Sequence, residues 1–320
     1  MTSRLISVII PAFNREKHIA CCLDSVMRQT FNNLEIIVLD DCSTDNTIAI
    51  VKRFNDPRVK LIALEKNIGA QAARNRGIHE AAGDWIAFQD SDDEWLPDKL
   101  TKQLNELEKV NFDLFTVVHS NCFTCTTEKG KKEFWELPFI QGENVFPALL
   151  KNSGPMFQAI VVSKIALEKI GYLDEKVPSY QEWDTAIQLA RHCRFIHIKE
   201  PLFIYNIHGD DRISKNLKLD VQGYEYIMHK FESDIKAIGG AALWNEHLFT
   251  QLKRCLEFQL WDEADAYLLR LKRARTFNLK DYKLCGRYKL RPSDYFNNSW
   301  DGVPLLKRIQ IKIAKQLLAF

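Results

Sequence analysis

The sequence predicts an α/β fold: a mostly parallel, Rossmann-like sheet flanked by helices, with a helical C-terminal extension. Over the first 120 residues, short β-branched runs alternate with segments of helical periodicity. The runs are mostly apolar, as in strands that are buried on both faces of a parallel sheet. From residue 221 onward the apolar pattern is helical, with 17 Lys and Arg against 11 Asp and Glu, whereas the first 220 residues hold 27 against 31. An acidic part and a basic part with different roles are therefore expected.

Continuous apolar runs predict five strands, at residues 5–10, 34–39, 59–63, 85–88 and 114–119. Apolar spacing and capping residues predict helices between them, at residues 18–29, 48–54, 70–82 and 97–110. Farther along, helical patterns cover residues 184–192, 224–238, 243–267 and 268–275. Residues 139–213 otherwise contain longer loops and scattered prolines, which indicates a second lobe that completes a cleft over the first.

The last sixteen residues, 305–320, form an apolar stripe at helical spacing with four cations off it. Such a helix fits an anionic membrane surface, and a terminal helix docked on the protein itself is the alternative. The longest apolar runs have about eight residues, against the ~20 needed to cross a bilayer. Sparse cysteines in apolar segments are typical of a reducing compartment. We expect a cytoplasmic protein that binds the inner face of the cell membrane if residues 305–320 lie on lipid.

Polar side chains follow four successive predicted strands, and parallel strands bring their carboxyl ends to one rim of the sheet, where ligands of open α/β sheets bind. These residues are Asn14, Asp40, Asp41, Asn67, Asp90 and Asp92, with Gly69 in the same loop as Asn67. In an extended segment Asp90 and Asp92 point to the same side, and two such carboxylates repel each other unless a cation lies between them. Hard oxygen ligands suit Mn²⁺ or Mg²⁺ held together with a diphosphate. An acidic surface turn is the alternative.

Short motifs follow one another between residues 5 and 214. They are SVIIPAFNRE at 7–16, SVMRQTF at 25–31, LDDCSTD at 39–45, NIG at 67–69, ARNRG at 73–77, FQDSDD at 88–93, IGYLDE at 170–175, QEWD at 181–184 and YNIH at 205–208. In order and spacing these motifs resemble the inverting family-2 glycosyltransferases, which have the GT-A fold. The resemblance does not extend to the last hundred residues.

The resemblance implies three parts: a nucleotide-sugar-binding subdomain at 1–115, an acceptor-binding subdomain with the catalytic base at 116–220, and a basic helical extension at 221–320. It implies transfer of a hexosyl or N-acetylhexosaminyl group from a nucleotide-sugar, with UDP-sugars expected, to a glycan or lipid-linked acceptor. Surface-polysaccharide synthesis is the expected setting. The formal charge of +2 suggests no nucleic-acid partner.

By position, six residues match those that contact the nucleotide-sugar in the family: Pro11, Asp41, Asn67, Arg74, Asp90 and Ser91. Asp41 resembles the carboxylate that accepts a hydrogen bond from the nucleobase. Asp92 resembles the carboxylate that binds Mn²⁺ or Mg²⁺. His208 resembles a histidine that approaches the metal or the diphosphate, and a structural hydrogen bond is its alternative role.

An inverting reaction needs a general base that faces the sugar from the side opposite the diphosphate. The family has a Glu–Asp pair at the start of a helix, and the matching residues here are Gln181 and Glu182. The resemblance therefore implies Glu182 as the base, with Asp184 as the second candidate. The alternative is that both carboxylates only favour the N-terminus of a helix.

Two further residues depart from the family pattern. Cys42 stands where the family usually has glycine, so a positive φ is not expected there. Asn206 stands where arginine is frequent, so one phosphate contact is expected to be absent.

Two other functions fit parts of the sequence. A non-catalytic module that binds nucleotide-sugars or glycans would keep the cleft without the base, and the departure at Gln181 and Glu182 is the feature in its favour. A nucleotidyltransferase is disfavoured because no Gly-rich, cationic triphosphate loop follows the first predicted strand.

Overall fold

A computed structural model describes residues 4–126, 130–208 and 216–274. The chain divides into two compact units, Met1–Lys215 and Asn216–Phe320, which are treated separately below. The helix predicted at 305–320, with its proposed membrane surface, lies outside the described residues.

Among the described residues of the first unit, nine strands form one sheet in the order β3-β2-β1-β4-β8-β6-β9-β5, with β7 paired to β6. Their bounds are β1 Ile6–Ala12, β2 Leu34–Asp40, β3 Val59–Ala63, β4 Trp85–Phe88, β5 Glu94–Trp95, β6 Thr116–Thr126, β7 Lys131–Trp135, β8 Val161–Ser163 and β9 Arg194–Ile207. The first four are parallel, as predicted. The α/β fold with flanking helices and C-terminal helices is confirmed.

The sheet is mixed beyond β4, which the sequence did not predict. The short strand β8 runs antiparallel between β4 and β6, so the strand predicted at 114–119 does not pair with β4 directly. The fourteen-residue β9 then pairs parallel to β6 with a register shift near Asn121. Strand β8 has only three residues, and in β9 charged residues and Pro201 separate the apolar positions, so the pattern of residues 139–213 differs from that of the first strands.

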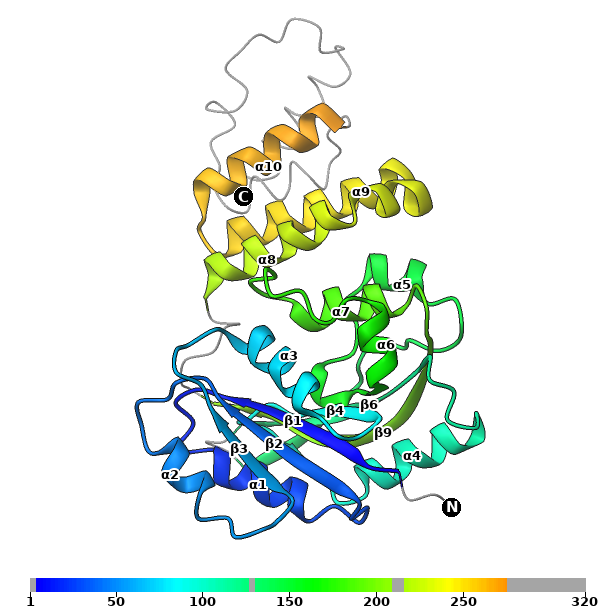
Figure 1. The fold of residues 1–320 in the computed structure, drawn as a ribbon. Coiled ribbons are helices and arrows are strands. Elements are labelled where there is room, and N and C mark those ends of the chain that lie inside the picture. The colour runs from blue at the N-terminus through cyan, green and yellow to red at the C-terminus, as the bar shows by residue number, and fades with distance from the viewer. Residues whose placement is uncertain (1–3, 127–129, 209–215, 275–320) are drawn as a thin grey trace, which may run out of the picture. The chain divides into compact units, whose positions relative to one another are not determined.

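Helices cover both faces of the sheet (Figure 1). Helices α1 (Ile19–Met27), α2 (Thr47–Val51) and α4 (Lys99–Lys109) lie on one side, and α3 (Ala70–Glu80) lies on the other. Helix α3 comes very close to β1 and β2, because a Cβ atom at Gly77 would lie 2.6 Å from Ile9 Cγ2 and 2.9 Å from Leu39 Cδ2. Glycine at this position therefore lets the helix approach the strands that lead into the rim.

Four short elements follow in the second half of this unit: α5 Phe146–Lys151, the 3₁₀ helix η1 Phe157–Ala159, α6 Lys164–Lys169 and α7 Gln181–Leu189. Helix α7 begins three residues earlier than the predicted start at 184. Trp183 anchors it, with its ring buried and Nε1 donating to the Leu149 carbonyl at 2.7 Å. This places Gln181 and Glu182 in the first turn of a helix, as the resemblance implies, although the apolar pattern alone begins at 184.

The second unit contains α8 (Leu217–Lys230), α9 (Glu232–Glu257) and α10 (Trp261–Ala274). The prediction of one continuous helix over 243–267 is wrong. Gln259 has a φ of 58°, which ends the helical backbone between α9 and α10. Tyr224 and His247 hydrogen-bond in the interior of this unit at 2.8 Å. None of the helices in the described ranges is both long and apolar enough to pass through a bilayer.

Lys99, the first residue of α4, is buried among apolar neighbours. Its side chain is 0% exposed, donates to Gln103 Oε1 at 2.6 Å, and lies over the Trp95 ring, 4.1 Å from its centroid. Burial lowers the pKa of the ammonium group well below its ordinary 10.5. Burial therefore disfavours the charged form of Lys99 more in the folded protein than in the unfolded chain.

We expect the free energy of unfolding of the wild type to rise relative to that of Lys99→Met as pH increases toward 10.5. The unfolded chain holds the Lys99 proton up to that pH, whereas the folded chain loses it at a lower pH. Stability rises with pH where the unfolded state binds more protons, by up to about 1.4 kcal/mol per pH unit for one proton. Denaturant unfolding at about pH 7 and about pH 9 measures the difference.

Lys109→Met is the matched control, since Lys109 is exposed at the other end of α4. Its difference from the wild type should be the same at both pH values. A Lys99→Met difference that also stays constant would mean that Lys99 remains charged in the folded protein.

Candidate active site

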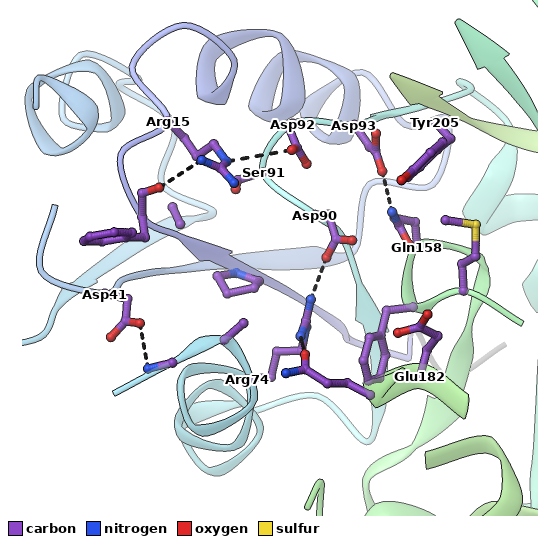
Figure 2. A pocket seen from close by; sticks show the side chains of 18 of the residues that line it. Arg15, Asp41, Arg74, Asp90, Ser91, Asp92, Asp93, Gln158, Glu182 and Tyr205 are labelled. Atoms are coloured by element: carbon purple, nitrogen blue, oxygen red, sulfur yellow. Dashed lines mark hydrogen bonds and ion pairs between the residues drawn. The ribbon is translucent and has the colours of Figure 1, made fainter. Parts of the chain in front are cut away.

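A cavity of about 510 Å³ opens at the carboxyl ends of β1, β2 and β4, with residues of η1 and α7 on its other side. Eight of the nine predicted site residues line it: Pro11, Asp41, Asn67, Arg74, Asp90, Ser91, Asp92 and Glu182. Figure 2 shows Asp41 at one side of the cavity and Glu182 at the other, with Asp90 and Arg74 between them. The ninth, His208, is not among the lining residues.

Asp41 is held by the loop that follows β3. Its two carboxylate oxygens accept the backbone N–H groups of Ile68 at 2.7 Å and Gly69 at 2.9 Å. Asn67 Nδ2 donates to the Asp41 carbonyl at 3.2 Å. Gly69 has a φ of 87°, which favours glycine at the turn into α3. The carboxylate therefore has a fixed orientation, and its remaining lone pairs can accept from a ligand in the cavity.

Cys42 adopts a φ of 66°, so the prediction that its φ would not be positive is wrong. The left-handed conformation costs a non-glycine residue roughly 1–2 kcal/mol. Neighbouring contacts hold the turn: Asp40 Oδ2 accepts Ser43 N–H at 2.9 Å, and Cys42 Sγ lies 3.7 Å from the Glu65 carbonyl. Cysteine is not β-branched, and it tolerates this conformation better than valine or isoleucine would.

Arg74 connects the two sides of the cavity. Its Nη2 donates to Asp90 Oδ1 at 2.7 Å, and its Nη1 donates to Gln71 at 2.9 Å and to Gln181 Oε1 at 3.3 Å. The guanidinium lies 4.4 Å from the centroid of the Phe157 ring. Burial raises the pKa of Asp90, and the charge of Arg74 opposes that shift. The departure at Gln181 thus places a neutral amide, rather than a second carboxylate, against Arg74.

Asp92 lies beside Arg15, which the sequence analysis did not assign to the site. Arg15 Nε is 3.8 Å from Asp92 Oδ2, and both side chains are partly exposed in the cavity wall (Figure 2). The Asp92 carbonyl accepts His208 Nε2 at 3.1 Å and Asn206 Nδ2 at 3.1 Å. His208 packs against His18 with ring centroids 3.9 Å apart. Here His208 supports the backbone of the acidic loop.

Asp93 is a third carboxylate at this edge, and it is buried. It accepts the Asn206 backbone N–H at 2.8 Å and a hydrogen bond from Gln158 Nε2. Burial, followed by the charges of Asp92 and Asp90, raises its pKa well above 3.8. Asn206 therefore binds the acidic loop through its backbone and its side chain. The motif at 88–93 could have suggested Asp93, but nothing in the sequence around Gln158 indicated its role.

Glu182 is the second residue of α7 and lines the cavity half-buried. Burial raises its pKa above 4.5, and the negative charge of Asp90 raises it further. Asp184, the second candidate, is 0% exposed, accepts from Gln188 Nε2 at 2.6 Å and is absent from the lining residues. Of the two carboxylates, Glu182 alone is therefore placed to meet a ligand in this cavity.

The acidic side chains of the cavity supply part of the ligand set that Mn²⁺ or Mg²⁺ requires. Across the described ranges, no three His, Cys, Asp or Glu side chains come together as a ready metal cage. Asp92 presents a carboxylate to the cavity, and Asp90 presents a second one that is paired with Arg74. Mg²⁺ sites commonly use one or two carboxylates and take their remaining ligands from substrate phosphates and water. The residues present fit a metal that binds together with a diphosphate.

The model of the family "Glycosyl transferase family 2" matches residues 7–171. A protein of Escherichia coli, UDP-Glc:alpha-D-GlcNAc-diphosphoundecaprenol beta-1,3-glucosyltransferase WfgD, is 32% identical over 232 residues, which are 70% of this chain and 87% of the relative. The chain belongs to glycosyltransferase family 2, and it is a glycosyltransferase. Membership of this family argues against the nucleotidyltransferase interpretation.

Two solved structures share the fold. TarS 1–349 of S. aureus in complex with UDP-GlcNAc has a TM-score of 0.65 at 18% identity, covering 98% of this chain and 90% of that one. Mannosyltransferase PcManGT of Pyrobaculum calidifontis, in complex with GDP-Man and Mn²⁺, has a TM-score of 0.57 at 16% identity, covering 98% and 87%. At these identities the likeness concerns the GT-A fold.

We expect Asp41→Asn to lower the free energy of unfolding by about 1–3 kcal/mol, because the new amide NH₂ would face one of two backbone N–H donors and leave it unpaired. Chemical denaturation measures the loss. Asp24→Asn is the control, since Asp24 is exposed on α1 and should change stability by less than about 0.5 kcal/mol. Equal effects of the two substitutions would show that the loop does not depend on the Asp41 carboxylate.

Proposed function

We propose that the protein is an inverting, metal-dependent glycosyltransferase that moves a sugar from a nucleotide-sugar, most simply a UDP-sugar, to a hydroxyl of a lipid-linked saccharide. The observation that carries this proposal is the arrangement of one cavity, with Asp41 at one side, Glu182 at the opposite side, and Asp90 and Asp92 in the lining between Asp41 and the acceptor half. Residues 1–115 would bind the donor, and residues 116–220 would bind the acceptor and supply the base.

At the donor side, the fixed carboxylate of Asp41 accepts an N–H from the nucleobase, and Pro11 and Asn67 line the same end. Arg74 lies beside Asp90 near the middle of the cavity, where the ribose and diphosphate would pass. Arg15 adds a second cation near Asp92. Together the two guanidinium groups offset the negative charge that a nucleoside diphosphate brings to this acidic rim.

On the acceptor side, Glu182 takes the proton of the attacking hydroxyl as the new glycosidic bond forms and the bond to the nucleoside diphosphate breaks. Glu182 works as a base only when it is ionised. Because its pKa is raised, the transfer rate should begin to fall on acidification at a pH above 4.5. A divalent ion at Asp92, when bound, would neutralise the charge that grows on the departing diphosphate. One displacement by a hydroxyl on the opposite face from the leaving group inverts the anomeric centre.

The choice of acceptor rests on the relatives. The Escherichia coli protein is named as a glucosyltransferase that uses UDP-Glc and an alpha-D-GlcNAc-diphosphoundecaprenol acceptor. Another relative of the chain, from Erwinia amylovora, is named for amylovoran biosynthesis. We propose the same class of acceptor here, a saccharide on a lipid diphosphate, which would bring the enzyme to a membrane surface during polysaccharide assembly.

Glu182→Gln is expected to lower kcat by about 10²–10⁴-fold, because the amide cannot accept the proton, while the dissociation constant of the donor changes little. Single-turnover transfer and calorimetric titration with UDP-sugar separate the two effects. Asp184→Asn is the matched control and should retain most of the rate, since Asp184 does not line the cavity. Lost donor binding with an unchanged single-turnover rate in Glu182→Gln would refute the assignment of the base.

Asp92→Asn is expected to abolish most of the gain in UDP affinity that Mn²⁺ gives the wild type, because an amide is a weaker ligand for a hard cation than a carboxylate. Calorimetric titration with UDP, with and without Mn²⁺, measures this gain. Asp84→Asn, at an exposed position before β4, should keep it. Wild-type transfer that is insensitive to a chelator would show that the reaction does not use a divalent metal.

A further inference from the structure

Strand β7 exposes all five of its residues, Lys131–Trp135, although it is paired with β6 along its whole length. Two of these residues are aromatic: Phe134 is 53% exposed and Trp135 is 42% exposed. Exposed aromatic side chains that gather next to a binding cavity commonly mark a surface that a ligand covers. The two rings lie on opposite faces of the strand, and they can therefore be distinguished by experiment.

Trp135 connects this strand to the cavity. In the register of the sheet, Trp135 lies opposite Cys122, which lies opposite Phe203 on β9. Tyr205, two residues farther along β9, therefore faces the same side of the sheet as Trp135. The Trp135 and Tyr205 rings are 5.9 Å apart between centroids and inclined by 58°. Because Tyr205 lines the cavity, the aromatic surface continues from inside the cavity to the exposed Trp135.

This surface lies at the acceptor side of the cavity. Figure 2 shows Tyr205, Gln158 and Glu182 on the side opposite Asp41. An acceptor hydroxyl must reach Glu182 from the side away from the nucleotide, so the rest of the acceptor leaves the cavity on this side. Tyr205 is one of the aromatic residues that line the cavity, and Trp135 extends its ring surface to the outside of the sheet.

The charges around Trp135 favour a saccharide over an anionic lipid surface. Lys131 and Lys132 are balanced by Glu133 and Glu136, and Lys131 pairs with Glu133 at 2.9 Å. A surface without net charge gains little from anionic headgroups, which attract clusters of Lys and Arg. A pyranose presents an apolar C–H face and polar edges, which suits an aromatic ring bordered by charged side chains.

We propose that Trp135, together with Tyr205, forms the acceptor-sugar platform, on which the saccharide bearing the reactive hydroxyl stacks as it enters the cavity. This inference rests on the proposed function, because it names the binding surface for the acceptor of that reaction.

The test uses the full-length enzyme, a UDP-sugar and α-GlcNAc-diphosphate carried on a short, soluble alkyl chain. Trp135→Ala should raise the KM for this acceptor by about tenfold and change the KM for the donor by less than about twofold, because the lost contact touches only the acceptor. Trp135→Phe keeps a ring and should recover most of the acceptor affinity. Thermal unfolding of both variants checks that they are folded.

Phe134→Ala is the matched control, since Phe134 is at least as exposed as Trp135 but faces the other side of β7. It should leave both KM values unchanged. An unchanged acceptor KM in Trp135→Ala, or equal losses for Trp135→Ala and Phe134→Ala, would overturn the platform. Weaker binding of Trp135→Ala to phosphatidylglycerol vesicles, with the soluble acceptor unaffected, would overturn it in favour of a lipid surface.

The experiment also distinguishes failure of the proposed transfer reaction from failure of the platform. A wild-type enzyme that binds the UDP-sugar but transfers nothing to this acceptor would contradict the acceptor class in the proposed function. Wild-type transfer with a Trp135→Ala variant that behaves like the wild type contradicts only the platform.

Discussion

The acidic loop after β4 sets the central constraint on this protein, because it places Asp90, Asp92 and Asp93 within four residues at the edge of the sheet. Carboxylates so close together repel each other, and each is balanced in a different way. Asp90 pairs with Arg74, Asp92 lies near Arg15, and buried Asp93 accepts from Asn206 and Gln158. Asp92 has the longest of these contacts, with Arg15 Nε at 3.8 Å, and in the proposed function it is the carboxylate that would bind a metal ion.

The ion pair between Arg74 and Asp90 also connects the two halves of the first unit. Arg74 comes from α3, which Gly77 allows to lie close against β1 and β2, and its guanidinium reaches both Asp90 and Gln181 at the start of α7. A carboxylate at position 181 would compete with Asp90 for that cation. With glutamine there, Glu182 is the carboxylate of α7 that borders the cavity, and its raised pKa follows from partial burial beside Asp90. The departure from the family motif is thus compatible with a working base.

Much of the first half of the fold could be predicted from local sequence. The strands that became β1 to β4 are short, apolar and bounded by turn residues, so each can be recognised within a few positions. Strands β8 and β9 could not be recognised, since one has three residues and the other contains Pro201 and polar residues. The sequence motifs named eight residues that line the cavity. Arg15 and Tyr205 stand in the motifs at 7–16 and 205–208 without an assigned role, and Gln158, outside the motifs, is brought to the cavity only by the folding of a distant segment.

The sequence by itself determined the class of the protein, the parallel direction of its first strands and the acidic rim, because each can be read from short motifs and from their order along the chain. The tertiary structure decided which carboxylate of α7 meets the cavity, how Cys42 turns with a positive φ, and which aromatic rings extend the cavity. Those features depend on contacts between residues that are tens of positions apart. Periodicity and motif spacing report the direction of a side chain only relative to its own strand or helix, and the neighbour that it meets is set by how the elements pack.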